Sequence, residues 1–221
     1  MKWIPDPTGR FPLRPHYDFD ELEAECERII TTFLEWRYGQ IIIPVPTDAL
    51  RVLIEREPAT LNVHADLSDE GEEIHGLTEF LPGNMPAVSI ARELTTQAWR
   101  AHRERTTLTH EYGHVHWHAP LYERYCRSGE RHSCARGKLL PMRSEADWME
   151  WQAGYISGAL LMLRSRIQLL VNAFRREHRV QTTINTGSVE GRLLIGRVSE
   201  VFDVSRDAAT VRLLQLGHLS D

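Results

Sequence analysis

The chain has 221 residues, of which 42% are hydrophobic and 26% charged. These values are typical of a globular protein that is large enough to bury a core without disulfides. The formal net charge is −5, so the overall charge gives no indication of binding to nucleic acid or to a membrane. Three cysteines, and no apolar run that resembles a signal peptide or a membrane span, lead us to expect a cytoplasmic protein with no membrane partner.

The first half of the chain changes from a helical to an alternating pattern. Residues 1–16 are rich in Pro and Arg, and we expect them to form an irregular arm. Apolar residues at helical spacing predict a helix over about 18–38 that ends at Gly39, and Thr47 is the expected N-cap of a second helix. Alternating residues then predict three strands, which we expect to form a small antiparallel sheet. These strands are 60–65, 74–81 and 87–90.

The second half is predicted to be mostly helical. A long helix is expected over about 95–118, closed by Pro120, and residues 119–143 are expected to form an ordered insertion or a flap. Further helices are predicted at about 144–164 and on to about 178, at 192–202, and at 206–216. The last two resemble a helix-turn-helix, but we expect them to pack in a helical subdomain rather than to bind DNA. We therefore expect a first domain over 1–165 with a C-terminal helical subdomain, 166–221, packed on it.

A zinc motif lies near the end of the predicted long helix. His110-Glu111-Tyr112-Gly113-His114 fits His-Glu-x-x-His. Side chains four residues apart share one face of a helix, so the two imidazoles can bind one zinc ion while Glu111 takes a proton from zinc-bound water. Chains of this composition contain the pattern by chance about once in twenty. The alternative is a helix with two surface histidines.

A catalytic zinc needs a third protein ligand and an open position for water. Glu150 is the best candidate, because it lies on a second predicted helix whose apolar residues can pack against the motif helix. Glu145 and Asp147 compete for this role from the same helix. His116 and His118 are turned off the ligand face by their two-residue spacing, and we expect them beside the site or in solvent.

With these residues in place, the chain resembles the ImmA/IrrE family of bacterial and phage metallopeptidases over about residues 20–217. Three motifs carry the resemblance in the same order: His110-Glu111-Tyr112-Gly113-His114 with His116 and His118, Glu150-x-x-Ala153 with Leu160-Leu161-Met162, and Val201-Phe202-Asp203-Val204-Ser205 with Arg212-Leu213. The second is similar to the family's Glu-x-x-Ala-Asn…Leu-Leu-Met-Pro, with Gly154 in place of Asn and Leu163 in place of Pro. The third is similar to Phe-x-Val-Ser…Arg-Leu.

The resemblance implies a small zincin-like α+β domain with a helical C-terminal part and with Glu150 as the third ligand. It also implies a protein substrate, commonly a helix-turn-helix repressor that is cleaved to derepress a stress, mobile-element or phage-defence operon. We therefore expect an endopeptidase with one zinc ion, on His110, His114 and Glu150, and with Glu111 as general base. Two alternatives stay open: a DNA-binding regulator with a structural zinc and no peptidase activity, and an interaction protein with an inactive zincin fold.

The sequence also suggests how such a site is regulated and completed. Cys126 is the candidate inhibitory fourth ligand, and Cys134 the second candidate, because a bound thiolate would displace the water. An idle thiol, or a zinc knuckle of Cys126, Cys134 and His132, would explain the same residues. Nearby basic residues would let single-stranded DNA pull the loop away as an effector. Tyr155 is the candidate oxyanion stabiliser, with Tyr122 and His132 as alternatives.

Overall fold

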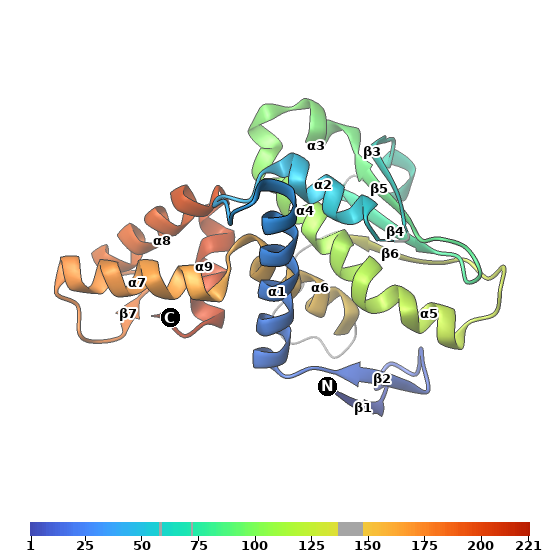
Figure 1. The fold of residues 1–221 in the computed structure, drawn as a ribbon, viewed down its shortest axis with the longest axis horizontal. Coiled ribbons are helices and arrows are strands. Elements are labelled where there is room, and N and C mark those ends of the chain that lie inside the picture. The colour runs from blue at the N-terminus through green and yellow to red at the C-terminus, as the bar shows by residue number, and fades with distance from the viewer. Residues whose placement is uncertain (58, 72, 137–147) are drawn as a thin grey trace.

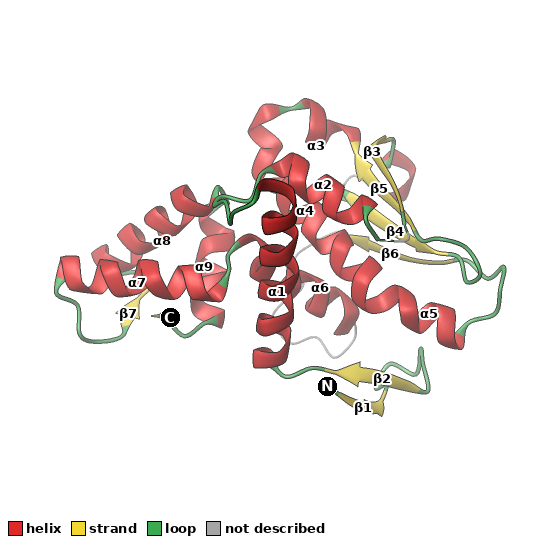
Figure 2. Ribbon diagram, viewed as in Figure 1, coloured by secondary structure: helices red, strands yellow, loops and turns green. Residues whose placement is uncertain are grey.

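The computed structural model describes residues 1–57, 59–71, 73–136 and 148–221. Helix α1 (Phe19–Tyr38) crosses the middle of the molecule, with a sheet and the motif helix on one side and three C-terminal helices on the other (Figure 1). Helices dominate, and the larger sheet lies at one side of the molecule (Figure 2). The α+β class predicted from the sequence is confirmed. None of the described helices has the length and apolar character needed to cross a membrane.

The first two helices begin and end for local reasons. Asp18 and Glu21 form a capping box at the start of α1: Glu21 N donates to Asp18 Oδ1 at 2.9 Å, and Asp18 N donates to Glu21 Oε2 at 3.1 Å. Gly39 ends the helix with a φ of 70°, a conformation that glycine adopts without strain. Helix α2 (Thr47–Glu55) follows Pro46, so Thr47 is its first helical residue rather than its N-cap.

The N-terminal segment is a β-hairpin, so the prediction of an irregular arm was wrong. Strands β1 (Lys2–Pro5) and β2 (Leu13–His16) pair antiparallel. Asp6 fixes the connection, because its carboxylate accepts from the Phe11 N–H and from the indole N–H of Trp148, both at 3.0 Å. The second contact attaches the hairpin to the helix that carries Glu150, a long-range interaction that composition alone does not indicate.

The larger sheet has four strands in the order β3-β5-β4-β6. Strand β4 (Gly76–Phe80) is antiparallel to β5 (Ala87–Ala91) and to β6 (His132–Arg136), but β3 (Thr60–Ala65) is parallel to β5. The predicted antiparallel sheet is therefore mixed. Its fourth strand comes from the segment that was expected to be an insertion or a flap.

The predicted long helix is a series of shorter helical segments. These are α3 (Arg92–Thr96), a 3₁₀ turn (Ala98–Arg100), α4 (Ala101–Gly113), a π turn (His114–His118) and α5 (Ala119–Tyr125). Pro120 does not close the helix, as it was expected to do. It lies in the first turn of α5, where a missing N–H costs nothing. The Ala119 N–H instead donates to His114 O, five residues back, so the wider π turn carries the chain past the proline.

The C-terminal helices share one hydrophobic core with the rest of the chain. They are α6 (Trp148–Leu161), α7 (Arg164–His178), α8 (Val189–Phe202) and α9 (Arg206–Gln215), with a small parallel pair of strands, β7 (Ile184–Asn185) and β8 (Leu219–Ser220). A single cluster of buried side chains includes Leu22 of α1, Ile156 of α6, Phe174 of α7 and Phe202 of α8. The division at residues 165 and 166 stays a prediction. The expected start of the α6 helix at 144 lies outside the described residues.

Candidate metal centre

The structure brings the three predicted ligands together. His110 Nε2 lies 3.1 Å from His114 Nε2 and 3.0 Å from Glu150 Oε2, and His114 Nε2 lies 3.1 Å from Glu150 Oε1. The two histidines come from the last turn of α4 and the first residue of the π turn, and Glu150 comes from the first turn of α6. We call these three residues the motif centre.

These separations fit a shared divalent cation. Ligands at 2.0–2.1 Å from a tetrahedral zinc ion lie about 3.3 Å from one another, so all three edges of the motif centre are within a few tenths of an ångström of that spacing. Two neutral imidazole nitrogens and a carboxylate are also a donor set that zinc prefers. The residues present therefore fit a zinc ion.

A close helix crossing sets the position of Glu150. A Cβ on Gly113 would lie only 3.2 Å from Ala153 Cα, so glycine at this position lets α4 approach α6 closely. Ala153 is fully buried, and Glu150 is three residues earlier on the same face of α6. The motif residue Gly113 thus matters for packing, and it brings the carboxylate of one helix to the imidazoles of the other.

Glu150 stays ionised in this setting. Burial alone would raise its pKa, but hydrogen bonds from His110 and His114 outweigh burial and hold the pKa of Glu150 well below its usual value. A carboxylate that keeps its charge is what a zinc ligand requires. The competing candidates Glu145 and Asp147 lie outside the described residues.

Glu111 is fully buried against β4. Thr78 Oγ1 donates to Glu111 Oε2 at 2.7 Å, and a Cβ on Gly76 would come within 2.3 Å of Glu111 Oε1. Gly76 and Thr78 share one face of the strand, since side chains alternate. The strand therefore fixes the glutamate from two points. Neither contact can be predicted from the sequence, because both depend on the register of β4 against the motif helix.

We expect Gly76→Ala to lower any hydrolysis that depends on Glu111 while leaving metal content unchanged. The added methyl group must displace the Glu111 carboxylate, and a displacement of about 1 Å at a catalytic group can cost about 10²-fold in rate. Turnover and zinc content of the purified variant test this. Gly154→Ala is the matched control, because a Cβ there meets nothing within 4 Å. Equal turnover in the two variants would contradict the role of Gly76.

Two further polar side chains orient His114. His118 Nδ1 lies 2.9 Å from His114 Nδ1, and His118 Nε2 lies 2.8 Å from Gln152 Oε1. The amide oxygen of Gln152 can only accept, so His118 Nε2 carries a proton and His118 Nδ1 accepts from His114 Nδ1–H. In the neutral form that binds a metal, His114 therefore carries its proton on Nδ1 and presents the lone pair of Nε2 to the motif centre. His118 is thus fully buried beside the site, whereas His116 is half-buried and contacts Glu57.

The cysteine beside the motif centre is Cys134, so the preference for Cys126 is corrected. Thr78 and Cys134 are paired across β4 and β6, and paired side chains point to the same face of a sheet. Thr78 faces Glu111, and Cys134 accordingly faces the motif helix, where its thiol is 5% exposed and in hydrogen-bond contact with His114. Cys126 instead lies at the end of α5, where burial and then Glu130 raise the pKa of its thiol.

Tyr155 does not reach the motif centre. Its hydroxyl donates to Glu23 of α1, which is itself bound by Arg212, so its contacts do not support a role in stabilising an oxyanion. Of the two alternatives, Tyr122 is in hydrogen-bond contact with Cys134 and stacks on Phe80, with ring centroids 4.1 Å apart. The structure thus brings Tyr122 nearer to the site than Tyr155.

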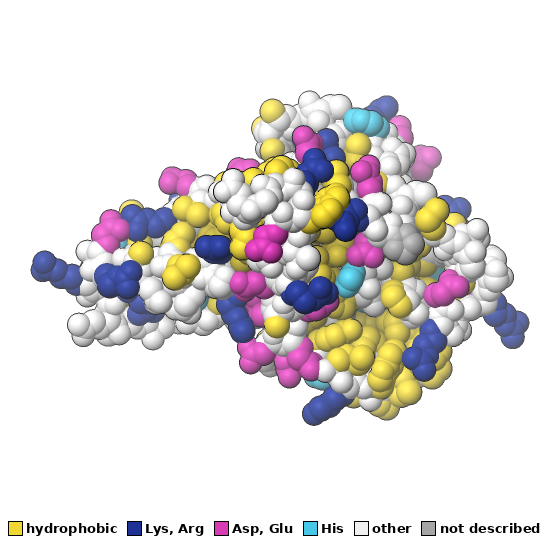
Figure 3. Space-filling model, viewed as in Figure 1, with side chains coloured by type: hydrophobic (Ala, Val, Ile, Leu, Met, Phe, Trp, Pro, Cys, Tyr) yellow, Lys and Arg dark blue, Asp and Glu magenta, His cyan; other side chains and the backbone are white. Residues whose placement is uncertain are grey.

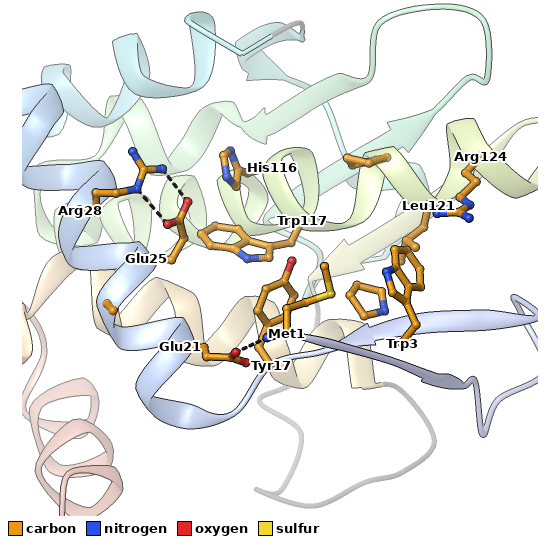
Figure 4. Close-up of a pocket in the computed structure, with 13 residues that line it drawn as sticks. Met1, Trp3, Tyr17, Glu21, Glu25, Arg28, His116, Trp117, Leu121 and Arg124 are labelled. Carbon is orange, nitrogen blue, oxygen red and sulfur yellow. Dashed lines mark hydrogen bonds and ion pairs between the residues drawn. The ribbon is translucent and has the colours of Figure 1, made fainter.

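A cavity of about 570 Å³ opens between α1, the hairpin and the π turn (Figure 4). Trp3, Tyr17, Trp117 and Leu121 contribute to its lining. None of the three ligands lines it. Hydrophobic side chains gather on this face over the hairpin (Figure 3), and Trp3 is 42% exposed. The cavity is therefore distinct from the motif centre.

No protein-family model matches this chain, and no curated protein matches it either.

Proposed function

We propose that this chain is a zinc-dependent endopeptidase with a zincin-like fold, similar to the ImmA/IrrE peptidases. The observation that carries the proposal is the convergence of His110, His114 and Glu150, whose ligating atoms lie within 4.8 Å of one another. Only the first two come from the motif itself. The third comes from a separate helix, and two surface histidines on a single helix would not acquire such a partner.

Each residue then has a defined task. His110, His114 and Glu150 hold the ion, which, when bound, polarises the scissile carbonyl and lowers the pKa of a water molecule to about 7. Glu111 accepts the proton of the attacking water and passes it to the leaving amine. Thr78 holds the Glu111 carboxylate in place through its hydroxyl.

We propose a helix-turn-helix repressor as the substrate, by the resemblance of this chain to the ImmA/IrrE family. The test is to incubate the purified full chain with a small helix-turn-helix protein encoded by a neighbouring gene and to analyse the products by mass spectrometry. We expect a single cleavage that is lost on chelation and restored by zinc. A protein that binds zinc at the motif centre but cuts no partner would instead indicate the regulatory or inactive alternatives.

We further propose that Cys134 restrains the enzyme by occupying the fourth zinc position. Cys134→Ser keeps the size of the side chain but removes the thiolate, so basal cleavage of the repressor should rise several-fold, as measured by initial rates. Ser133→Ala is the control, because Ser133 is exposed and points to the opposite face of β6. Unchanged rates in Cys134→Ser would exclude this restraint.

Adding single-stranded DNA to the wild-type protein tests the proposed effector, which should raise the initial rate of repressor cleavage.

A further inference from the structure

A second group of metal-ligand side chains lies outside the motif centre. Ligand atoms of Cys126, Glu130 and His132 all lie within 4.8 Å of one another. These residues belong to the turn between α5 and β6: Cys126 ends the helix, and His132 begins the strand. We call them the loop site. None of the three was needed to account for the peptidase chemistry.

The backbone of the turn brings these side chains together. Glu130 N donates to Arg127 O at 3.1 Å, and the Arg127 N–H donates to Glu130 Oε2 at 3.2 Å. Gly129, with a φ of 90°, permits the tight reversal. The chain thus returns Glu130 towards the end of α5, where the Cys126 N–H is held by Tyr122 O at 2.9 Å. The loop site is a folded turn with fixed ends.

Contact with Tyr122 holds the ring of His132 in place, but the hydrogen-bonding capacity of its Nε2 atom is unsatisfied within the described part of the chain. The ring lies against Tyr122, with centroids 5.1 Å apart, and Tyr122 in turn stacks on Phe80 of the sheet. Among the described residues, His132 Nε2 is buried and has no hydrogen-bond partner, since the nearest Glu130 oxygen is 3.5 Å away. A buried polar atom without a partner is costly, and a cation between the nitrogen and the carboxylate would satisfy both.

We propose that Cys126, Glu130 and His132 bind a second zinc ion, separate from that of the motif centre. A thiolate, an imidazole and a carboxylate together are a donor set suited to zinc, whereas magnesium and calcium prefer oxygen ligands alone. Cys126 is half-buried and the side chain of Glu130 is 49% exposed, so the ion can enter from solvent and keep a water ligand. The ion would join the end of α5 to the start of β6, the strand that also holds Cys134 beside His114.

The test is cobalt titration of the metal-free full chain, followed by absorbance, because a bound thiolate gives a charge-transfer band that imidazole and carboxylate do not. We expect the wild-type protein to bind two equivalents. His110→Ala/His114→Ala should bind one equivalent and keep the thiolate band. Adding Cys126→Ser to that double variant should remove both the ion and the band, whereas adding Cys134→Ser should remove neither. Zinc should displace the cobalt in each case.

The outcomes separate the two metal sites. A His110→Ala/His114→Ala variant that binds no cobalt, or a Cys126→Ser variant that retains the full cobalt content and band of the wild type, would overturn the loop site. The proposal stands without the peptidase function, since a wild-type protein that binds one equivalent, keeps it in His110→Ala/His114→Ala and loses it in Cys126→Ser would count only against the motif centre. Circular dichroism of each variant establishes that it is folded. Where the double variant does not fold, the cobalt content of Cys126→Ser and Cys134→Ser in the wild-type background gives the comparison, with one equivalent expected in Cys126→Ser and two in Cys134→Ser.

Discussion

Replacing Glu111 with Gln is expected to abolish the proposed repressor cleavage and to leave the metal content unchanged. The amide occupies the same buried space beside Thr78 but cannot accept a proton from the attacking water. General-base catalysis of this kind contributes about 10²–10⁴-fold to the rate, so activity should fall by at least that factor. Initial cleavage rates and metal analysis of the same preparation give the two measurements.

The control for Glu111→Gln is Glu123→Gln. Glu123 lies on α5 and accepts from the Gly83 N–H at 2.9 Å, away from the motif centre. Its substitution should leave the cleavage rate close to that of the wild-type protein. If Glu111→Gln cleaved at the wild-type rate, Glu111 would not be the base. If it also lost zinc, the loss of activity could not be assigned to proton transfer, and the geometry of the motif centre would have to be tested by structure determination.

Replacing Arg212 with Ala is expected to lower the free energy of unfolding by about 3–5 kcal/mol. Arg212 of α9 and Glu23 of α1 are 1% and 2% exposed and form a bidentate pair, with N–O distances of 2.6 and 2.7 Å. Arg212 also donates to Met162 O, and Tyr155 donates to Glu23. Removing the arginine leaves a buried carboxylate whose one remaining hydrogen bond among the described residues comes from Tyr155. Urea denaturation measures the change.

Two further variants show whether the buried charge is the cause. Adding Glu23→Gln to Arg212→Ala should restore part of the lost free energy, because the uncompensated charge is removed. Arg197→Ala breaks an exposed pair with Glu177 in α7 and should leave the unfolding free energy nearly unchanged. A loss in Arg212→Ala no greater than in Arg197→Ala would contradict the proposed role of the buried pair in attaching the C-terminal helices.

The helices and part of the site could be predicted because their signals are local. Asp18, Glu21 and Gly39 mark the ends of α1 in the sequence, and the structure uses all three. The spacing of His110 and His114 places them on one face of a helix. Glu150 was chosen by the pattern of its own helix together with the family resemblance. Each of these inferences depends on neighbours within a few turns.

The parts of the fold and of the site that could not be predicted depend on contacts between segments far apart in the sequence. Residues His132–Arg136 have no β-branched or aromatic residue to indicate a strand, and they become one by pairing with β4. That pairing decides that Cys134, rather than Cys126, contacts His114. In the same way, the role of Gly76 depends on the strand meeting Glu111. Tyr155 shares a helix with Glu150, but it lies on a different face and contacts α1.

The π turn at His114–His118 lets the motif helix contact two neighbouring elements with different sides. An added residue in a helical turn shifts the angular phase of everything that follows by about 100°. Up to the start of the π turn, the side chains of His110 and His114 face helix α6. After the π turn, the ring of Tyr122 stacks on Phe80 at the end of strand β4. The successive segments α4, the π turn and α5 therefore present differently rotated faces to helix α6, which carries Glu150, and to the sheet.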